Sequence, residues 1–551
     1  MKFSVLLILL LIPSLSLFAQ VETVPANHAV YEFLKKMQVA GILKSYDDIM
    51  IPISQSTINT AFLEIENRIS ELSDSERELF YKFKEKFSWI NDDNLNIKDK
   101  SDNLLNYFFA DKQKHLYSFS DSAISFYIDP IIENKYIAVN NFDSKSSLLN
   151  FGGIFKGTYK NFLGYYLQAS NGMLFGNLDA AREDKRIEQS FSINDTKINF
   201  FDNTSGYVRF QNDNLSLQFG RERLLWGAGY LNRLVLSNNP QMFDFLRFNF
   251  HYKTLSYDFL HGWLVQKPLY VYMDSTNVSE KQKRSKYIAI SRLGYTPTPE
   301  LKLGISQIII YSNRPFEAAY LNPFLFWESA QRSMNDYDNS FLSFDGRFKI
   351  TDGVEVSASI ILDDINFSTF GKWNAYNNSL VWQTGAYITY PMLFPNFSAE
   401  IEYSQNRPYM FSHPGFDEAL TYTNNGYLLG INIQPNSSLF SFRLTYLVNE
   451  EIKMNASFEH LLRGKNIYDD DGKLLQNVGG NVFEYHTLYD SPQVALLAGN
   501  IERINLWTLN LEYEFLYGFY VNLGCKLNTM LFENDRNDRT VIWSSIKIDF
   551  E

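Results

Sequence analysis

The sequence predicts an all-β transmembrane barrel of about 18 antiparallel strands, preceded by a small periplasmic α-helical unit at the N-terminus. Three observations carry this prediction: an export leader with no later apolar helix, a long alternation of apolar and polar residues, and connections that are alternately short and long. Aromatic residues make up 16% of the chain, yet the mean hydropathy is -0.23. Aromatic-rich strands interleaved with polar residues explain both values.

Residues 1–19 have the organisation of a secretory signal peptide. Lys2 supplies the positive charge, residues 5–18 are almost all apolar, and the small Ala19 precedes Gln20, so we expect cleavage after Ala19. The apolar run is shorter than the roughly 20 residues that span a bilayer, and no Cys follows it for a lipid anchor. Because no later run of about 18 apolar residues exists, the exported chain is either released or inserted as a barrel.

Residues 20–115 are predicted to form the periplasmic helical segment, with the clearest helical pattern over residues 24–90. Apolar residues recur at helical spacing in its first part, at Val30, Phe33, Leu34 and Met37. A second helix is expected over residues 57–72. A third is expected to begin at Ser73, because Ser73 and Glu76 have the spacing of a capping box.

Residues 116–551 are predicted to form the barrel, because the period of the pattern there changes to two. In NFSAEIEYS, residues 396–404, aromatic and aliphatic side chains alternate with serines and glutamates. SLFSFRLTY and LWTLNLEYEF repeat this division, and VIWSSIKIDF forms a closing strand that ends in an aromatic residue. Apolar side chains on one face and charged ones on the other fit a wall with lipid outside and water inside.

The connections separate a membrane barrel from a soluble β-sheet protein. Short turns such as residues 351–353 and 516–518 alternate with long loops such as residues 221–245 and 461–503. Long loops on one side only are typical of outer-membrane barrels. The strand count treats GYLLGINI as part of a loop. A soluble β-sandwich or propeller is the alternative, but these folds rarely combine one-sided long loops with a signal peptide.

Composition argues against several functions. The net charge of -12, without a basic stripe, argues against nucleic acid as a partner. Cys525 is the only cysteine, which excludes an internal disulfide framework and a zinc site built from several thiolates. YDDDGKLLQN, residues 468–477, lacks the first and twelfth acidic ligands of an EF-hand. We therefore expect neither a metal nor a cofactor.

The sequence offers little support for an enzyme. None of the seven histidines falls in a metal-binding pair or beside a G-x-S-x-G serine. His486, flanked by Glu484 and Asp490, is the one cluster that would merit a test. Barrel hydrolases assemble their catalytic groups from distant strands, so spacing alone leaves that class open. We expect a non-enzymatic protein.

The loop GRERLLWGAGYLNRLVLSNNP, residues 220–240, has a composition that suits a polysaccharide. Trp226 offers a flat face for a sugar ring, and Arg and Asn side chains donate hydrogen bonds to hydroxyls and carboxylates. Gly227 and Gly229 allow close approach of the backbone. The alternative is that Trp226 belongs to the interfacial aromatic belt and that the arginines form salt bridges inside the barrel.

GRERLLWGAGYLNRLVLSNNPQMFD resembles the signature segment of the Wzi family of outer-membrane capsule-assembly proteins. Three other stretches also resemble family features: RPFEAAYLNPFLFWESAQRSMNDYDNSFLSFDGRF, GYLLGINIQPNSS and VPANHAVYEFLKKMQVAGIL. The resemblance implies an outer-membrane barrel of about 18 strands with a periplasmic helical bundle. It also implies a lectin that helps to hold exported capsular polysaccharide on the cell surface.

Site residues and partners follow from this resemblance. The sugar-contact role is predicted for Arg221, Trp226, Asn232, Arg314, Asn322, Asp338 and Asn339. Packing in the barrel wall is the alternative for each of them. The expected partners are a capsular or other surface polysaccharide and outer-membrane lipid, and peptidoglycan or a periplasmic export component is a candidate partner for residues 24–90. The alternative function is a porin-like solute channel lined by Glu400, Glu402, Arg443, Glu512 and Glu514.

Overall fold

The computed structural model describes residues 20–87, 104–121, 123–140, 142–190, 199–266, 269–273, 278–282, 284–322, 324–334, 338–365, 374–390, 394–414, 418–533 and 535–550. The expected signal peptide, residues 1–19, lies outside these residues. Among the described residues, no helix has the length and apolar character needed to cross a membrane.

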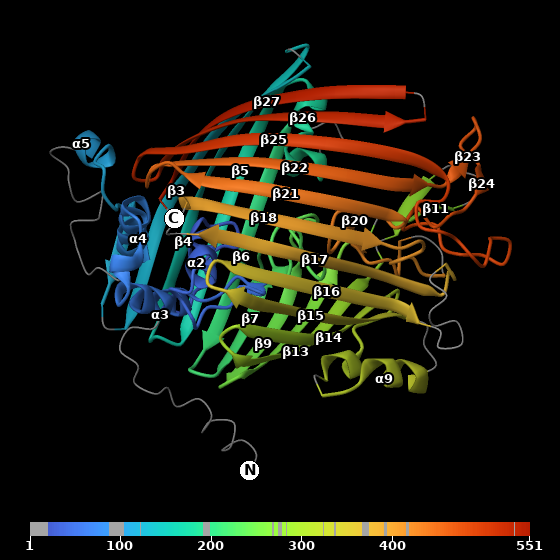
Figure 1. Cartoon of the computed structure of the whole chain (residues 1–551), viewed down its shortest axis with the longest axis horizontal. Helices are drawn as coiled ribbons and strands as arrows, with labels where there is room; N and C mark the ends of the chain where they lie inside the picture. The colour runs from blue at the N-terminus through green and yellow to red at the C-terminus, as the bar shows by residue number, and fades with distance from the viewer. Residues whose placement is uncertain are drawn as a thin grey trace, which may run out of the picture.

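Within the described part of the chain, 18 antiparallel strands close into one barrel, which confirms the predicted fold (Figure 1). They are β3 (Ile124–Val139), β4 (Ser144–Tyr159), β5 (Leu163–Gly176), β6 (Phe200–Gln211), β7 (Leu215–Arg221), β9 (Asp244–Tyr252), β10 (Leu255–Leu264), β13 (Lys286–Thr298), β14 (Leu301–Ser312), β15 (Asn339–Thr351), β16 (Val354–Ile365), β17 (Asn378–Tyr390), β18 (Phe394–Asn406), β21 (Ser437–Leu447), β22 (Ile452–Lys465), β25 (Asn500–Leu516), β26 (Phe519–Phe532) and β27 (Asp535–Asp549). Each strand pairs with the next along this series, and β27 pairs with β3 to close the barrel.

The remaining short elements are not members of this ring of strands, although β2 (Tyr117–Ser120) pairs with β3. They are β2, β1 (Met50–Ile51), β8 (Leu225–Trp226), β11 (Leu269–Met273), β12 (Val278–Gln282), β19 (Thr423–Asn424), β20 (Tyr427–Leu428), β23 (Ile467–Tyr468), β24 (Leu474–Gln476), α6 (Leu178–Ala181), α7 (Lys185–Glu188), η4 (Ala318–Leu321) and α9 (Trp327–Met334). GYLLGINI contributes only β20, which pairs with β19 inside a long connection, as the strand count required.

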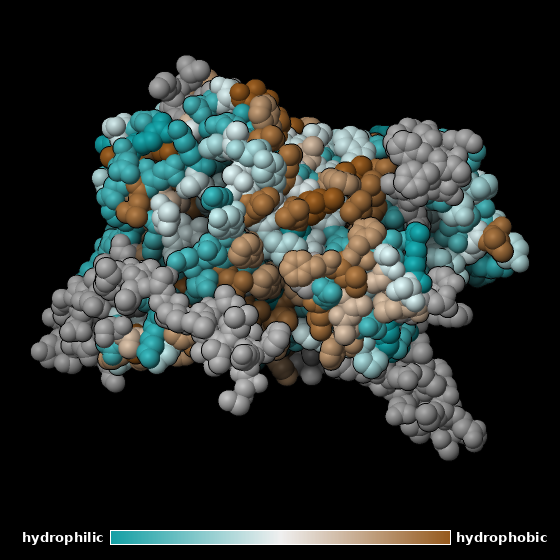
Figure 2. Space-filling model, turned by 90° about the horizontal axis from the view of Figure 1, so that it is seen from below, coloured by the Kyte–Doolittle hydropathy of each residue, from teal (hydrophilic) through white to brown (hydrophobic). Residues whose placement is uncertain are grey.

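The two faces of the wall follow the predicted alternation. On β18, Phe397 is 40% exposed on the outer face, whereas its neighbours Glu400 and Glu402 are buried inside the barrel. The same division holds on β25, where Trp507 and Leu509 are exposed. Figure 2 shows hydrophobic residues gathered across the middle of one outer face, with hydrophilic residues toward the ends. This apolar outer band is the surface that a lipid bilayer requires of a barrel.

The N-terminal helices lie at the end of the barrel that carries the short turns (Figure 1). They are α2 (Val30–Val39), α3 (Gln55–Glu66), η1 (Ile69–Glu71) and α4 (Asp74–Phe87), and α5 (Leu104–Phe108) follows separately. Phe33, Phe62 and Phe80 pack within their common core. The predicted capping box is present, since Glu76 N–H donates to Ser73 Oγ at 3.2 Å and Ser73 N–H donates to Glu76 Oε2 at 3.0 Å.

Candidate functional site

The loop between β7 and β9 enters the lumen and meets the N-terminal helical unit there. Its strand β8 pairs with β1, with Trp226 opposite Met50 and Leu225 opposite Ile51. The Gly227 N–H also donates to the carbonyl of Ile49 at 2.9 Å. A connection from the long-loop end and a segment from the short-turn end therefore share one small sheet inside the barrel.

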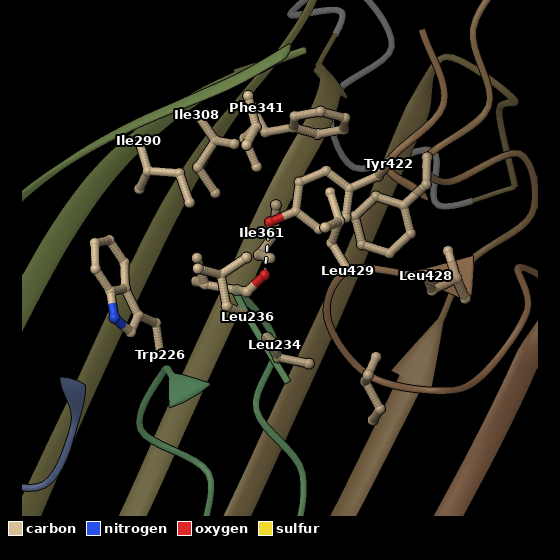
Figure 3. Close-up of a cluster of buried hydrophobic side chains, with 14 of the residues drawn as sticks. Trp226, Leu234, Leu236, Ile290, Ile308, Phe341, Ile361, Tyr422, Leu428 and Leu429 are labelled. Carbon is tan, nitrogen blue, oxygen red and sulfur yellow. Dashed lines mark hydrogen bonds between the residues drawn. The ribbon is translucent and has the colours of Figure 1, made fainter. Parts of the chain in front are cut away.

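Trp226 is 1% exposed and belongs to a buried hydrophobic cluster inside the barrel, which we call the lumen core. Figure 3 shows Trp226 with Leu234 and Leu236 of its own loop, and with Ile290 and Ile308 from the wall. The connection between β18 and β21 supplies further members of the lumen core, among them Tyr422, Leu428 and Leu429. Trp226 is therefore not part of an interfacial aromatic belt, and its ring face is covered by protein.

The β7–β9 and β18–β21 connections are hydrogen-bonded to each other in the lumen core. Ser237 N–H donates to the carbonyl of Leu429 at 2.9 Å, and Ser237 Oγ donates to the carbonyl of Gly430 at 2.5 Å. Tyr422 Oη donates to the carbonyl of Val235 at 2.7 Å. A Cβ at Gly430 would lie 1.8 Å from the carbonyl oxygen of Leu234, so only glycine allows this approach.

A buried group of charges joins the helical unit to the wall. Asp48 forms ion pairs with Arg347 of β15, with Arg233 of the β7–β9 loop at 3.2 Å, and with Lys35 of α2 at 3.6 Å. Burial alone would raise the pKa of Asp48, but the charges of Arg347, Lys35 and Arg233 hold that pKa well below its usual range. Burial, together with the charge of Arg347, lowers the pKa of Lys35 to about 8.

The residues that would line a channel under the porin-like alternative have protein partners in the structure. Glu402 accepts hydrogen bonds from the backbone N–H groups of Tyr230 and, at 2.9 Å, Asn232. The remaining residues of this set form ion pairs: Arg443 with Glu400 at 2.8 Å, Glu514 with Lys82 of α4 at 2.9 Å, and Glu512 with Lys453 at 3.6 Å. This lumen lining therefore binds the segments that fill the barrel or pairs with itself.

A cavity of about 580 Å³ remains between the helical unit and the wall. Its lining includes Glu32, Lys82, Asn232, Arg443 and Tyr520. Among the residues that the structure describes, no group of three or more His, Cys, Asp or Glu side chains is placed to hold a metal ion.

The sequence-predicted site residues fall into separate places. Trp226 and Asn232 lie in the lumen, and Arg221 forms an exposed ion pair with Asp244 at 2.8 Å. Arg314 donates to both oxygens of Asp338, and Asn339 Nδ2 donates to the carbonyl of Leu420 at 2.9 Å. Asn322 is exposed and ends η4. The structure does not bring this set together, and Arg221 and Asn322 are its exposed members.

An exposed aromatic surface lies on the β22–β25 connection, at the long-loop end. Tyr489 and Leu488 are 100% and 101% exposed, and Tyr485 and Phe483 are more than a third exposed. The supporting polar contacts are local: Thr487 N–H and Oγ1 donate to Asp490 Oδ2 at 2.7 and 2.8 Å. Sequence reasoning missed this surface because a loop has no periodicity, although the aromatic-rich stretch FEYHTLYD was visible.

The histidine cluster on the same connection has a structural arrangement. The ring of His486 stacks on Tyr376 with centroids 3.6 Å apart, and its Nε2 lies 3.1 Å from the carbonyl of Ser491. Glu484 accepts hydrogen bonds from Tyr468, and Asp490 accepts from Thr487. The two carboxylates that flank His486 in sequence therefore bind other side chains. In YDDDGKLLQN, the N–H of Lys473 donates to Asp469 in an exposed turn.

A protein family matches this chain in sequence, and solved structures match it in fold. The family model of the capsule assembly protein Wzi matches residues 150–541, more than half of the chain. The structure of Wzi from Escherichia coli, described as an outer-membrane protein involved in group 1 capsule assembly and a carbohydrate-binding β-barrel, aligns with 13% identity and a TM-score of 0.57. The alignment covers 96% of this chain and 99% of that protein.

Two further solved barrels, both from Pseudomonas aeruginosa, match less well. OprD has 11% identity over 79% of this chain and 96% of its own, with a TM-score of 0.41. OpdK, solved with vanillate, has 10% identity over 77% of this chain and 98% of its own, with a TM-score of 0.43. No curated relative matches the chain.

Proposed function

Because this chain belongs to the Wzi family of capsule assembly proteins, we propose that it is a non-enzymatic outer-membrane lectin that binds exported capsular polysaccharide and helps to retain it on the cell surface. The observation that carries the proposal is the exposed aromatic surface around Tyr489 on the β22–β25 connection. Exposed aromatic rings stack on sugar rings, and neighbouring carboxylates and amides bind hydroxyls.

The location of this surface supports the proposal. The outer-membrane barrel presents its long loops on the side away from the N-terminal helices (Figure 1). Barrels of this class expose their long loops to the cell exterior. A polymer outside the cell would therefore meet Tyr489 without entering the lumen.

The predicted sugar-contact residues divide into two roles under this proposal. Arg221 and Asn322 are exposed and remain candidate sugar contacts. Trp226, Asn232, Arg314, Asp338 and Asn339 would act by holding loops in place, because each packs against protein or has a protein hydrogen-bond partner.

The helical unit is proposed to face the periplasm, because it lies at the short-turn end. Peptidoglycan or a component of the export machinery is its candidate partner. The porin-like alternative is weaker, since Glu402, Glu514 and Arg443 bind the segments that fill the lumen.

The test is retention of polysaccharide by whole cells. A strain that lacks the gene is complemented with the wild type, Tyr489→Ala, or Tyr252→Ala, which changes a 51% exposed tyrosine at the short-turn end. We expect deletion to release glycan into the medium, wild type and Tyr252→Ala to restore retention, and Tyr489→Ala to restore less, at equal amounts of folded barrel. Unchanged retention after deletion would refute the proposal.

A further inference from the structure

The connection between β14 and β15 folds back over the outside of the barrel. Residues 313–322 and 324–334, which we call the outer clasp, contain η4 and α9, and α9 lies outside the strands beside β14 and β15 (Figure 1). Tyr320 and Trp327 are 0% and 1% exposed and pack with Ile309 of β14. The neighbouring Ile308 belongs to the lumen core, so alternation places Ile309 on the outer face.

The outer clasp covers polar side chains of the wall. Gln307 points outward like Ile309, and its Nε2 donates to the carbonyl of Leu325 at 2.9 Å while its Oε1 accepts from Trp327 N–H at 3.1 Å. Ser340 Oγ donates to Glu328 at 2.6 Å. An outward amide without such partners would be costly against acyl chains. The clasp thus takes the place that lipid occupies elsewhere on the barrel.

Two residues predicted as sugar contacts, Arg314 and Asp338, hold this segment against the barrel. Arg314 donates to Asp338 at 2.9 and 2.5 Å, and Tyr320 Oη donates to Asp338 at 2.6 Å. Asp338 is 4% exposed and directly precedes β15. These contacts connect the start of the clasp to the strand that follows it, so the segment is a folded part of the wall.

The outer surface of the clasp is apolar where it continues the lipid-facing wall. Phe324 and Phe326 are 91% and 59% exposed, and the Phe324 ring stacks on Tyr257 of β10 with centroids 6.3 Å apart. On the same outer face, Leu293 and Ile305 are 46% and 41% exposed. A single exposed phenylalanine is common on protein surfaces, but Phe324 and Phe326 lie beside the apolar wall and enlarge its exposed apolar surface.

We propose that the outer clasp is a lipid-facing part of the barrel, with Phe324 and Phe326 lying among the acyl chains of the bilayer. Glu328, which pairs with the exposed Arg332 at 2.8 Å on α9, accepts a hydrogen bond from Ser340 at the long-loop start of β15, and this contact points to the level of the lipid headgroups. Charged side chains are tolerated at that level and are costly at the bilayer centre. The proposal depends on the barrel being in a membrane and not on its binding a polysaccharide.

The single cysteine allows a direct test of depth. Cys525 is replaced by alanine, and a nitroxide label is attached to Phe324→Cys in the full-length barrel, reconstituted in vesicles of phosphatidylethanolamine and phosphatidylglycerol. Collision of the label with oxygen, which concentrates in the acyl region, is compared with collision with a water-soluble nickel chelate. Leu293→Cys gives the lipid reference and Tyr489→Cys the water reference.

We expect the label at residue 324 to collide with oxygen as the label at residue 293 does, and to lose most nickel collisions relative to residue 489. Phe326→Cys repeats the measurement if Phe324→Cys fails to insert. Nickel collisions equal to those at residue 489 would overturn the proposal. A label protected from both oxygen and nickel would also overturn the proposal if that protection disappeared when the protein was diluted in lipid. In that case a second copy of the protein would be covering the surface.

Discussion

At the scale of single residues, Trp226, which was predicted as a sugar contact, is buried in the lumen core. Its neighbours in the lumen core come from two long loops and from the wall. None of these neighbours is adjacent in the sequence, and Met50 pairs with it from the N-terminal unit. Composition singled out residues 220–240 as a loop rich in Arg, Asn, Gly and Trp. Whether such a loop extends outward or folds into the lumen depends on contacts with distant segments, and composition carries no information about those contacts.

We expect Trp226→Ala to lower the free energy of unfolding by about 3–5 kcal/mol, the usual cost of removing a large buried aromatic side chain. Urea titration of the barrel in lipid vesicles, followed by gel mobility, measures this loss. Trp226→Phe is the control and should lose less, because Trp226 Nε1 has no hydrogen-bond partner among the described residues. Unchanged stability together with lost glycan retention would instead restore the role of Trp226 as a sugar contact.

At the scale of elements, the strands were predictable and the segments between them were not. Alternation on β18 placed Phe397 outside and Glu402 inside because each face meets a different medium. The outer clasp was not predicted, because Gln307 on an outward position is explained only once Leu325 and Trp327 are seen to bind it. Local pattern thus identifies which side of the wall a residue faces, and tertiary contacts determine what covers it.

Docking of α2 should depend on pH through Asp48. Because the pKa of Asp48 is depressed in the folded protein, its stabilisation is complete above the unfolded pKa, about 4, and is lost as the pH falls through the lower folded pKa. The loss is measured as the change between pH 6 and pH 3 in the amide-exchange protection of α2, which is the exchange rate relative to that of an unfolded chain at the same pH. Asp48→Asn should exchange faster already at pH 6 and show a flatter dependence, since Arg347 and Arg233 lose their partner. Equal pH dependence in the two proteins would exclude Asp48 as the cause.

At the scale of the whole molecule, the strand count and the closed barrel were predicted, with the family resemblance as a guide. The filling of the lumen was not, because it depends on pairs such as Glu402 with Asn232 and Glu514 with Lys82, which join distant parts of the chain. Sequence reasoning interpreted these acidic residues either as a channel lining or as an inner wall. In the structure, both carboxylates have protein partners, and a conductance measurement decides between the two interpretations.

We expect the wild-type barrel in a planar lipid bilayer to conduct far less than an open barrel with the same number of strands, because loops and helices occupy the lumen. Single-channel recording tests this. A steady conductance of open-porin size would favour the channel alternative, above all if its ion selectivity changed in Glu512→Gln and not in the loop variant Glu484→Gln.

The pairing of β1 with β8 has a mechanical consequence. Met50 belongs to a segment continuous with the N-terminal helices, and Trp226 belongs to a loop that starts at the opposite end of the barrel. Backbone hydrogen bonds between them form a direct connection through the membrane-spanning barrel. Tension applied to the β7–β9 loop would therefore reach the segment that carries Asp48, and the Arg233–Asp48 ion pair would share that tension.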